Sequence, residues 1–204
     1  MGFYAVILLV VIVTCYPVFW VLMQSFKTSM ELANNAPYTM PGSVYFGNYI
    51  KAFTASKLVR YFMNSAIIAV CSLLLIVAVG SPAAFAISKI RFKMAEPMMS
   101  FFLLGMMIPL FICLIPMFQI YNQLNLRNTY VSLILPQVGF SLPMCIYLYV
   151  AFMKYVPNSL VEAAMIDGAS SWLVFIRVIF PMAKNSTITI LIFNFVNVWN
   201  EFTY

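Results

Sequence analysis

Four long stretches of the chain contain no Lys, Arg, Asp or Glu: residues 3–24, 61–88, 97–126 and 128–153. About 20 apolar residues in a helix cross the hydrocarbon core of a bilayer, so each stretch is long enough to span a membrane. A fifth begins at Asn185 and stays uncharged up to Glu201. The apolar runs are continuous and do not alternate, which favours helices over barrel strands. We therefore predict an all-α polytopic membrane protein with helices near residues 3–24, 62–88, 98–121, 130–153 and 185–204.

The composition excludes several other classes. Only 8% of the residues are charged, against roughly a quarter in soluble domains. The eleven cations behind the net charge of +6 form no basic run, so we expect no nucleic-acid partner. The chain has no His and no Cys-x-x-Cys pair, so we expect no metal site. We predict no cofactor and no enzymatic activity, and nothing in the composition divides residues 1–204 into more than one domain.

Lys and Arg counts indicate the orientation. Lys89, Arg91 and Lys93 lie in the short connection 88–97, which favours the cytoplasmic side for it and, by alternation, for the connection 155–184. The longer loop 25–60 is rich in turn residues, so we expect it to be irregular and to lie on the opposite side. The prolines of the second and third helices, Pro82, Pro109 and Pro116, predict kinks; the general frequency of proline in membrane helices explains them equally well.

The connection 155–184 has the pattern of two short helices. Ser159 stands three residues before Glu162, which predicts a capping box and a helix that begins at Leu160. Gly168 predicts a left-handed C-terminal cap about two turns later. A helix this short is marginal alone, so it needs a partner surface.

Small side chains and one acidic side chain mark the partner-facing surface that we expect on this first short helix. Ala163 and Ala164 would let another protein approach the backbone closely. Asp167 lies at the end where a negative charge is unfavourable, so we expect a partner cation or the N-terminus of the next helix to hold it.

The second short helix is predicted to start at a Ser170 or Ser171 cap and to end at Pro181. Its apolar residues recur at helical spacing, which is typical of a helix on the membrane surface. These residues are Trp172, Phe175, Ile176 and Ile179.

This connection resembles the signature of ABC importer permeases, the binding-protein-dependent transport family: Glu-Ala-Ala, three residues, Gly, nine residues, Ile-x-Leu-Pro. Two positions depart from it, with apolar Val178 and Phe180 in place of Ile and Leu. The matching residues are Glu162, Ala163, Ala164, Gly168 and Pro181. Similarity to the sugar-importing branch, close to the second permease of maltose-type systems, extends to Ser25–Lys27, Asn48–Tyr49, Ala83–Ala86, Ile166–Ala169 and Trp199–Phe202.

The resemblance implies a type I importer transmembrane domain of six helices in the bacterial inner membrane, of which this sequence holds five. It implies a second permease, an ATPase dimer that binds the ATP, and an extracytoplasmic sugar-binding protein as partners. This chain has no phosphate-binding loop of its own. The residues expected to couple transport to the ATPase are Glu162, Ala163, Ala164, Asp167, Gly168, Ala169 and Pro181.

Polar residues in the fifth helix are candidates for the translocation pathway. Asn194, Asn197 and Glu201 recur at i, i+3 and i+7, so a helix would place them on one face. Polar groups within a bilayer need partners, which predicts that this face points into the bundle or the pathway. Hydrogen bonds between helices explain the asparagines equally well.

The sequence leaves other functions open. An ABC permease for another solute, such as glycerol phosphate, would share every feature above. A secondary transporter would also bind polar solutes within the membrane, but such carriers usually place charges deep in their spans, and none occurs here. A membrane scaffold would leave the capped cytoplasmic connection unexplained.

Overall fold

The computed structural model describes residues 2–203, and all regular secondary structure in that range is helical. The chain divides into two compact units, one up to Met63 and one from Asn64 onward. The sequence shows no boundary there, because the division follows contacts and not composition. Three helices are long and apolar enough to span a membrane: α1 (Gly2–Ser25), α4 (Leu58–Lys89) and α7 (Tyr130–Lys154). Two bent helix pairs raise the number of candidate spans to five.

The first unit contains α1 and two short helices, α2 (Ser29–Asn34) and α3 (Gly47–Thr54). The loop that we expected to be irregular therefore carries regular structure. The Asn48 Nδ2 donates to the carbonyls of Ser25 at 2.9 Å and Lys27 at 2.8 Å. The Ser25 and Tyr49 hydroxyls lie 2.6 Å apart. The two short motifs around Ser25 and Asn48 thus bind each other and hold this loop together.

Helix α2 carries a complete capping box. Thr28 Oγ1 accepts from the N–H of Glu31 at 3.2 Å, and Glu31 Oε2 accepts from the N–H of Thr28 at 2.8 Å. Glu31 Oε1 also accepts from the N–H of Gly42 at 2.9 Å. These two backbone hydrogen bonds to the carboxylate lower the pKa of Glu31.

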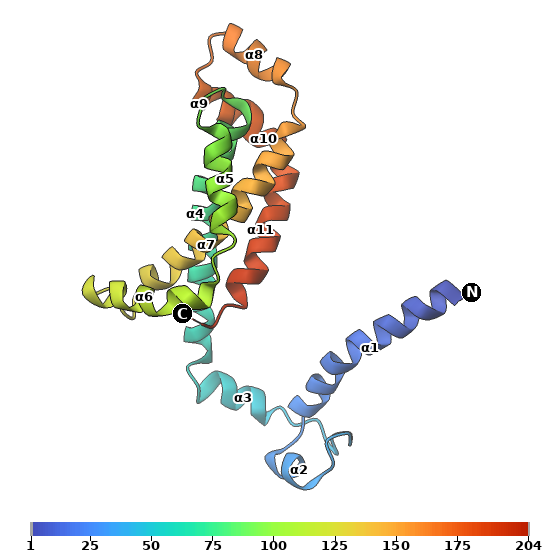
Figure 1. The fold of residues 1–204 in the computed structure, drawn as a ribbon. Coiled ribbons are helices and arrows are strands. Elements are labelled where there is room, and N and C mark those ends of the chain that lie inside the picture. Colours follow the sequence, from blue (N-terminus) through green and yellow to red (C-terminus); the bar gives the residue numbers. More distant parts are fainter. Residues whose placement is uncertain (1, 204) are drawn as a thin grey trace. The chain divides into compact units, whose positions relative to one another are not determined.

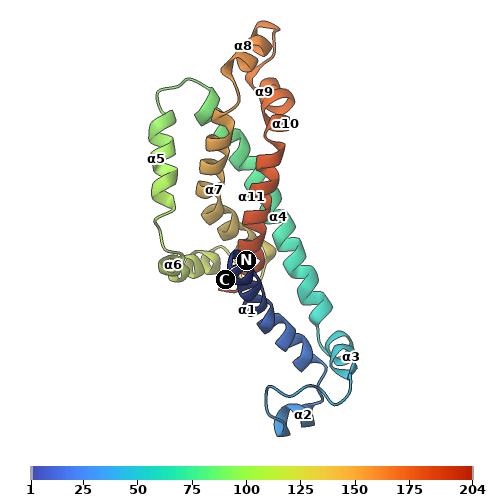
Figure 2. The same ribbon diagram turned by 90° about the vertical axis from the view of Figure 1, so that its right-hand side faces the viewer.

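In the second unit α4, α5 (Ala95–Gly105), α7 and α11 (Lys184–Trp199) run side by side (Figures 1 and 2). The core lies where α4, α7 and α11 meet the connection 155–184, and Tyr149 OH donates to Thr187 Oγ1 at 3.0 Å between α7 and α11. The buried side chains include Ile76, Phe85, Cys145, Ile146, Tyr149, Met153, Val174, Ile179 and Ile190.

The prediction of one helix over 98–121 is wrong. The stretch forms α5 and α6 (Leu110–Gln123), whose axes bend by 93°. Pro109 precedes α6 with no N–H to donate to the preceding turn and with extended backbone, φ −67° and ψ 128°, so no continuous helix runs through it. Pro82 and Pro116 lie inside α4 and α6 without ending them.

The fifth predicted helix is shorter than expected. Helix α11 ends at Trp199, with Asn200 as its C-terminal cap, and not at residue 204. It is bent by 75° from the preceding helical stretch Ser171–Met182.

Candidate functional site: an exposed short helix and a polar cavity

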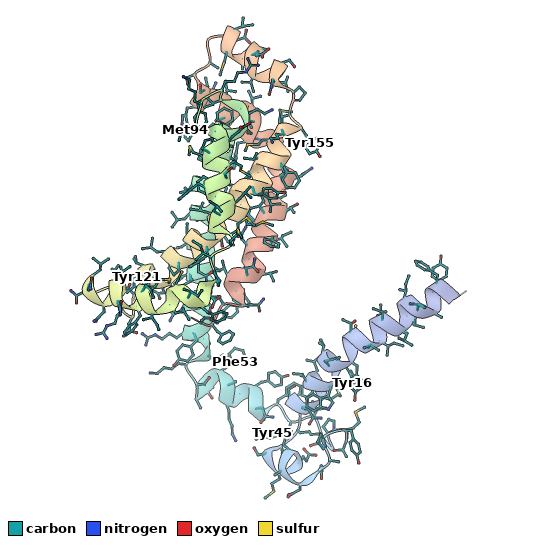
Figure 3. The ribbon with its side chains drawn as sticks, in the orientation of Figure 1. Tyr16, Tyr45, Phe53, Met94, Tyr121 and Tyr155 are labelled. Carbon is teal, nitrogen blue, oxygen red and sulfur yellow. The ribbon has the colours of Figure 1, made fainter. Side chains whose placement is uncertain are left out.

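Helix α8 (Asn158–Ile166) lies at one end of the second unit, beyond α7 and α9 (Ser171–Val174), as Figure 1 shows. Met94, between α4 and α5, and Tyr155, just after α7, lie at the same end (Figure 3). Lys89 joins the two connections directly: its Nζ donates to the Val156 carbonyl at 2.5 Å and to Asn158 Oδ1 at 2.9 Å. The connections 88–97 and 155–184 therefore share one end, as the alternation of spans predicts.

The start of α8 differs from the prediction. The helix begins at Asn158 after Pro157, and no side chain caps it. Ser159 already lies in the first turn, so it cannot form the predicted capping box with Glu162. Pro157 itself occupies the N-cap position, with φ −58° and ψ 135°, and its side chain has no acceptor that could cap the helix.

The end of α8 confirms the predicted left-handed cap. Gly168 has φ +85°. The N–H of Ala169 donates to the Ala164 carbonyl at 2.9 Å and that of Gly168 to the Met165 carbonyl at 3.1 Å, which is a Schellman motif. A Cβ at Gly168 would meet nothing within 4 Å, so the backbone angle and not crowding requires glycine. Ser170 then caps α9 by accepting from the N–H of Leu173 at 3.4 Å, also as predicted.

Helix α8 has an inner and an outer face. Val161 is buried, and Ala164 and Ala169 pack against the core. Ala164 therefore does not belong to the partner-facing surface, which corrects the prediction that paired it with Ala163.

The outer face of α8 combines apolar and acidic side chains. Ile166 is 86% exposed, and Glu162, Ala163 and Asp167 are exposed as well. Within residues 2–203 neither carboxylate has a hydrogen-bond or ion-pair partner. The N-terminus of the next helix does not hold Asp167, contrary to one of the two arrangements expected for it.

The helical stretch that follows α8 also departs from the expected single apolar face. Phe175 and Ile179 are buried, whereas Trp172 and Ile176 are exposed. A π-helix at Phe175–Ile179 links α9 to α10 (Phe180–Met182). The helical stretch ends at Met182, one residue after Pro181, which agrees with the predicted end to within one residue.

The structure does not bring the three candidate pathway residues together. Asn194 is buried, and its Nδ2 donates to the carbonyl of Ile190 at 2.8 Å, within its own helix. Asn197 is exposed. Glu201 lies beyond the end of α11 and not on its face, and it accepts from the N–H of Thr203 at 2.6 Å.

A cavity of about 180 Å³ lies between α4, α7 and α11, and sequence reasoning missed it. Gln137 of α7, only 8% exposed, lines it together with Glu201. The one available clue was that Gln137 is the only amide side chain within α7. The other lining residues are Ser65, Ile68, Leu133, Val198 and Trp199.

A larger cavity of about 570 Å³ lies beside α6 and the start of α7, and Tyr121, labelled in Figure 3, contributes to it. Its polar lining includes Arg127, Asn128 and Thr129. No group of three or more His, Cys, Asp or Glu side chains in residues 2–203 is placed to hold a metal ion.

The model of the binding-protein-dependent transport system inner membrane component family matches residues 76–204, more than half of the chain. The chain therefore belongs to this family of inner-membrane permeases.

Similarity extends to curated sugar permeases. The chain is 34% identical to the diacetylchitobiose uptake system permease protein NgcG of Streptomyces coelicolor, over 98% of this chain and 66% of that protein. It is 33% identical to the sulfoquinovosyl glycerol transport system permease protein SmoH of Agrobacterium fabrum, over 92% of this chain and 66% of the relative. The chain thus spans about two thirds of the length of these relatives.

The fold also matches a solved structure. A crystal structure of a bacterial ABC transporter involved in the import of the acidic polysaccharide alginate aligns with a TM-score of 0.81. The alignment covers 98% of this chain and 70% of that chain at 20% identity. The fold is therefore that of an ABC importer transmembrane domain.

Proposed function

We propose that this chain is a permease subunit of a binding-protein-dependent ABC importer for a sugar or oligosaccharide. It forms the translocation pathway with a second permease, receives solute from an extracytoplasmic binding protein, and couples to a separate ATPase dimer that binds the ATP. Family membership and the sugar permeases among its relatives support this proposal. The same architecture would serve another solute, such as glycerol phosphate. A secondary transporter would leave the outer face of α8 without a role.

The observation that carries the proposal is that α8 is held firmly in place while its outer side chains have no partner. The helix is only nine residues long, too short to be stable alone, yet Lys89 at its start and the Schellman motif at its end fix its position. It nevertheless presents an exposed Ile166 and two carboxylates without partners. An ATPase surface with an apolar centre and a basic rim would bury the apolar side chain and pair with both carboxylates.

The expected coupling residues divide into two roles under this proposal. Glu162, Ala163 and Asp167 contact the ATPase. Ala164, Gly168 and Ala169 hold the shape of α8, and Pro181 belongs to the helical stretch that carries movement to α11. When the ATPase subunits close on ATP, α8 moves with them, and the bonds from Lys89 pass that movement to α4.

Charge reversal on α8 tests the assignment. We expect Glu162→Lys combined with Asp167→Lys to lower the affinity of the purified permease pair for its ATPase at least tenfold, because two unfavourable charges would face a basic rim. The measurement is co-purification and titration of the ATPase at two salt concentrations. Glu96→Lys is the matched control, since Glu96 is exposed in the first turn of α5, outside the connection that carries α8. Equal affinity in the double variant and the control would contradict the docking role of α8.

A further inference from the structure

We infer that the cavity between α4, α7 and α11 is a solute-binding subsite that holds one neutral, hydroxyl-bearing ring, with Gln137 as its central contact. The inference deepens the proposed function and rests on it. Of the three pathway residues expected from the sequence, Asn194, Asn197 and Glu201, only Glu201 lines this cavity.

Gln137 is the amide side chain that faces this cavity without a hydrogen bond from the described protein. Its side chain is only 8% exposed, lines the cavity, and makes no hydrogen bond with any residue in 2–203. Among the described residues the Gln137 amide is not a sealed, unpaired group: its polar atoms remain open to the cavity. A bound group that supplies a donor and an acceptor can therefore reach them.

The lining has the chemistry to recognise hydroxyl groups. The Gln137 amide and the Ser65 hydroxyl can each donate and accept, and the Glu201 carboxylate accepts. Sugar hydroxyls both donate and accept, so they complement such a set. A cation would find only one carboxylate, which already accepts from the N–H of Thr203. Trp199 adds an aromatic surface of the kind that covers the apolar face of a ring.

The size of the cavity limits what it holds. Its volume of about 180 Å³ corresponds to about six water molecules in the liquid. That space suits one ring and not a whole oligosaccharide. A longer solute would therefore extend beyond the cavity while one ring occupies it.

The cavity lies at the end of the second unit away from α8. Gln137 stands seven residues after the start of α7, about 10 Å along the helix axis. Trp199 is the last residue of α11. Figure 2 shows the start of α7 and the end of α11 at the opposite end of the unit from α8.

Polar residues continue from the cavity toward α8 on all three helices. Ser72 follows Ile68 by four residues on α4, Ser141 follows Gln137 by four on α7, and Asn194 precedes Val198 by four on α11. A spacing of four keeps a residue on the same face, one turn further along. The Ser72 hydroxyl is buried and has no hydrogen-bond partner, so a second unpaired polar group lies along this direction.

The test uses the assembled importer in proteoliposomes with its binding protein, and radiolabelled diacetylchitobiose and maltose as probes. Uptake of either probe by the parental importer checks the proposed function separately from the subsite. We expect Gln137→Leu to lower that uptake at least tenfold while the ATPase still co-purifies at the parental ratio. Gln119→Leu is the matched control, because Gln119 is exposed on α6 and lines neither cavity, and it should transport at the parental rate.

A second measurement covers the case in which Gln137→Leu fails to assemble. In a background without native cysteines, Gln137→Cys and Gln119→Cys are labelled with a small thiol reagent while the importer is trapped by vanadate. We expect the transported probe to slow labelling of Gln137→Cys at least fivefold and to leave Gln119→Cys unchanged. Parental uptake by Gln137→Leu, or labelling of Gln137→Cys that the probe does not slow, would overturn the subsite even in an importer that transports sugar.

Discussion

Two short helices outside the candidate spans, α2 and α8, are stabilised in opposite ways. In α2 the Thr28 and Glu31 side chains satisfy the helix N-terminus, and the same carboxylate binds the Gly42 amide. In α8 no side chain caps the start, and the carboxylates of Glu162 and Asp167 bind nothing within residues 2–203. The first helix uses its acidic group for its own fold, whereas the second leaves its acidic groups exposed.

Under the proposed docking role of α8, the difference distinguishes a short helix that serves its own fold from one that binds a partner. Both contain Glu, and both sequences show the Ser/Thr-x-x-Glu pattern of a capping box. The backbone of α8 is fixed instead by Lys89 at one end and by Gly168 at the other. Because these anchors lie on the inner side or in the backbone, the outer side chains remain free for another protein.

The largest effect is expected at the anchor at the end of α8. Gly168→Pro would force φ from +85° to about −65°, remove the N–H that donates to the Met165 carbonyl, and cost on the order of 3 kcal/mol. We expect transport in proteoliposomes to fall about 100-fold, at about 1.4 kcal/mol per factor of ten.

The control for this change is Gly139→Ala. Gly139 lies inside α7 with open space around it, so alanine there should leave transport unchanged and raise stability slightly. Full transport by Gly168→Pro would contradict the contrast between α2 and α8, since it would show that α8 does not need its glycine cap.

A smaller effect is expected at the other anchor. Lys89→Met removes the hydrogen bonds to the Val156 carbonyl and to Asn158, and we expect it to weaken coupling by about 1–2 kcal/mol, since partial exposure reduces what charged hydrogen bonds contribute. The readout is ATP hydrolysis per solute transported, which should rise several-fold. Lys93→Met, at an exposed lysine that makes no hydrogen bond or ion pair with the described residues of α8, should leave the ratio as it was. A ratio equally raised in both variants would show that loss of charge matters and the anchor does not.

The smallest effect concerns α2. The pKa of Glu31 in the folded chain is lowered below its usual value of 4.5, so its contribution to stability is complete above that value and is lost as the pH falls through the folded pKa. We expect amide exchange at Thr28 and Gly42, measured relative to the intrinsic rate, to accelerate once the pH falls below about 4.5. Glu31→Gln should remove this pH dependence. Unchanged protection at pH 3 would mean that the capping box does not depend on ionised Glu31.

Hydropathy was sufficient to place most helices, because long uncharged runs leave few alternatives. It could not locate the break at Pro109, since Pro82 and Pro116 look the same in sequence and interrupt nothing.

Local patterns predicted the candidate site unevenly. Gly168 was identified correctly because a positive φ at a helix end strongly favours glycine. The capping box was expected at Ser159 and found at Thr28, because α8 starts at Asn158 and Ser159 therefore lies inside its first turn. Gln137 was missed because it lines a cavity together with residues of α4 and α11, and the sequence does not show that these three helices meet there.

The division of α8 into two faces has a consequence for how such importers diversify. Residues that hold the helix, such as Val161 and Ala164, differ from those that face outward, such as Glu162 and Ile166. Under the proposed docking role, exchange of the outward residues would pair the subunit with a different ATPase while its own packing is preserved. The residues that choose the partner and those that stabilise the fold would then be separate within one nine-residue helix.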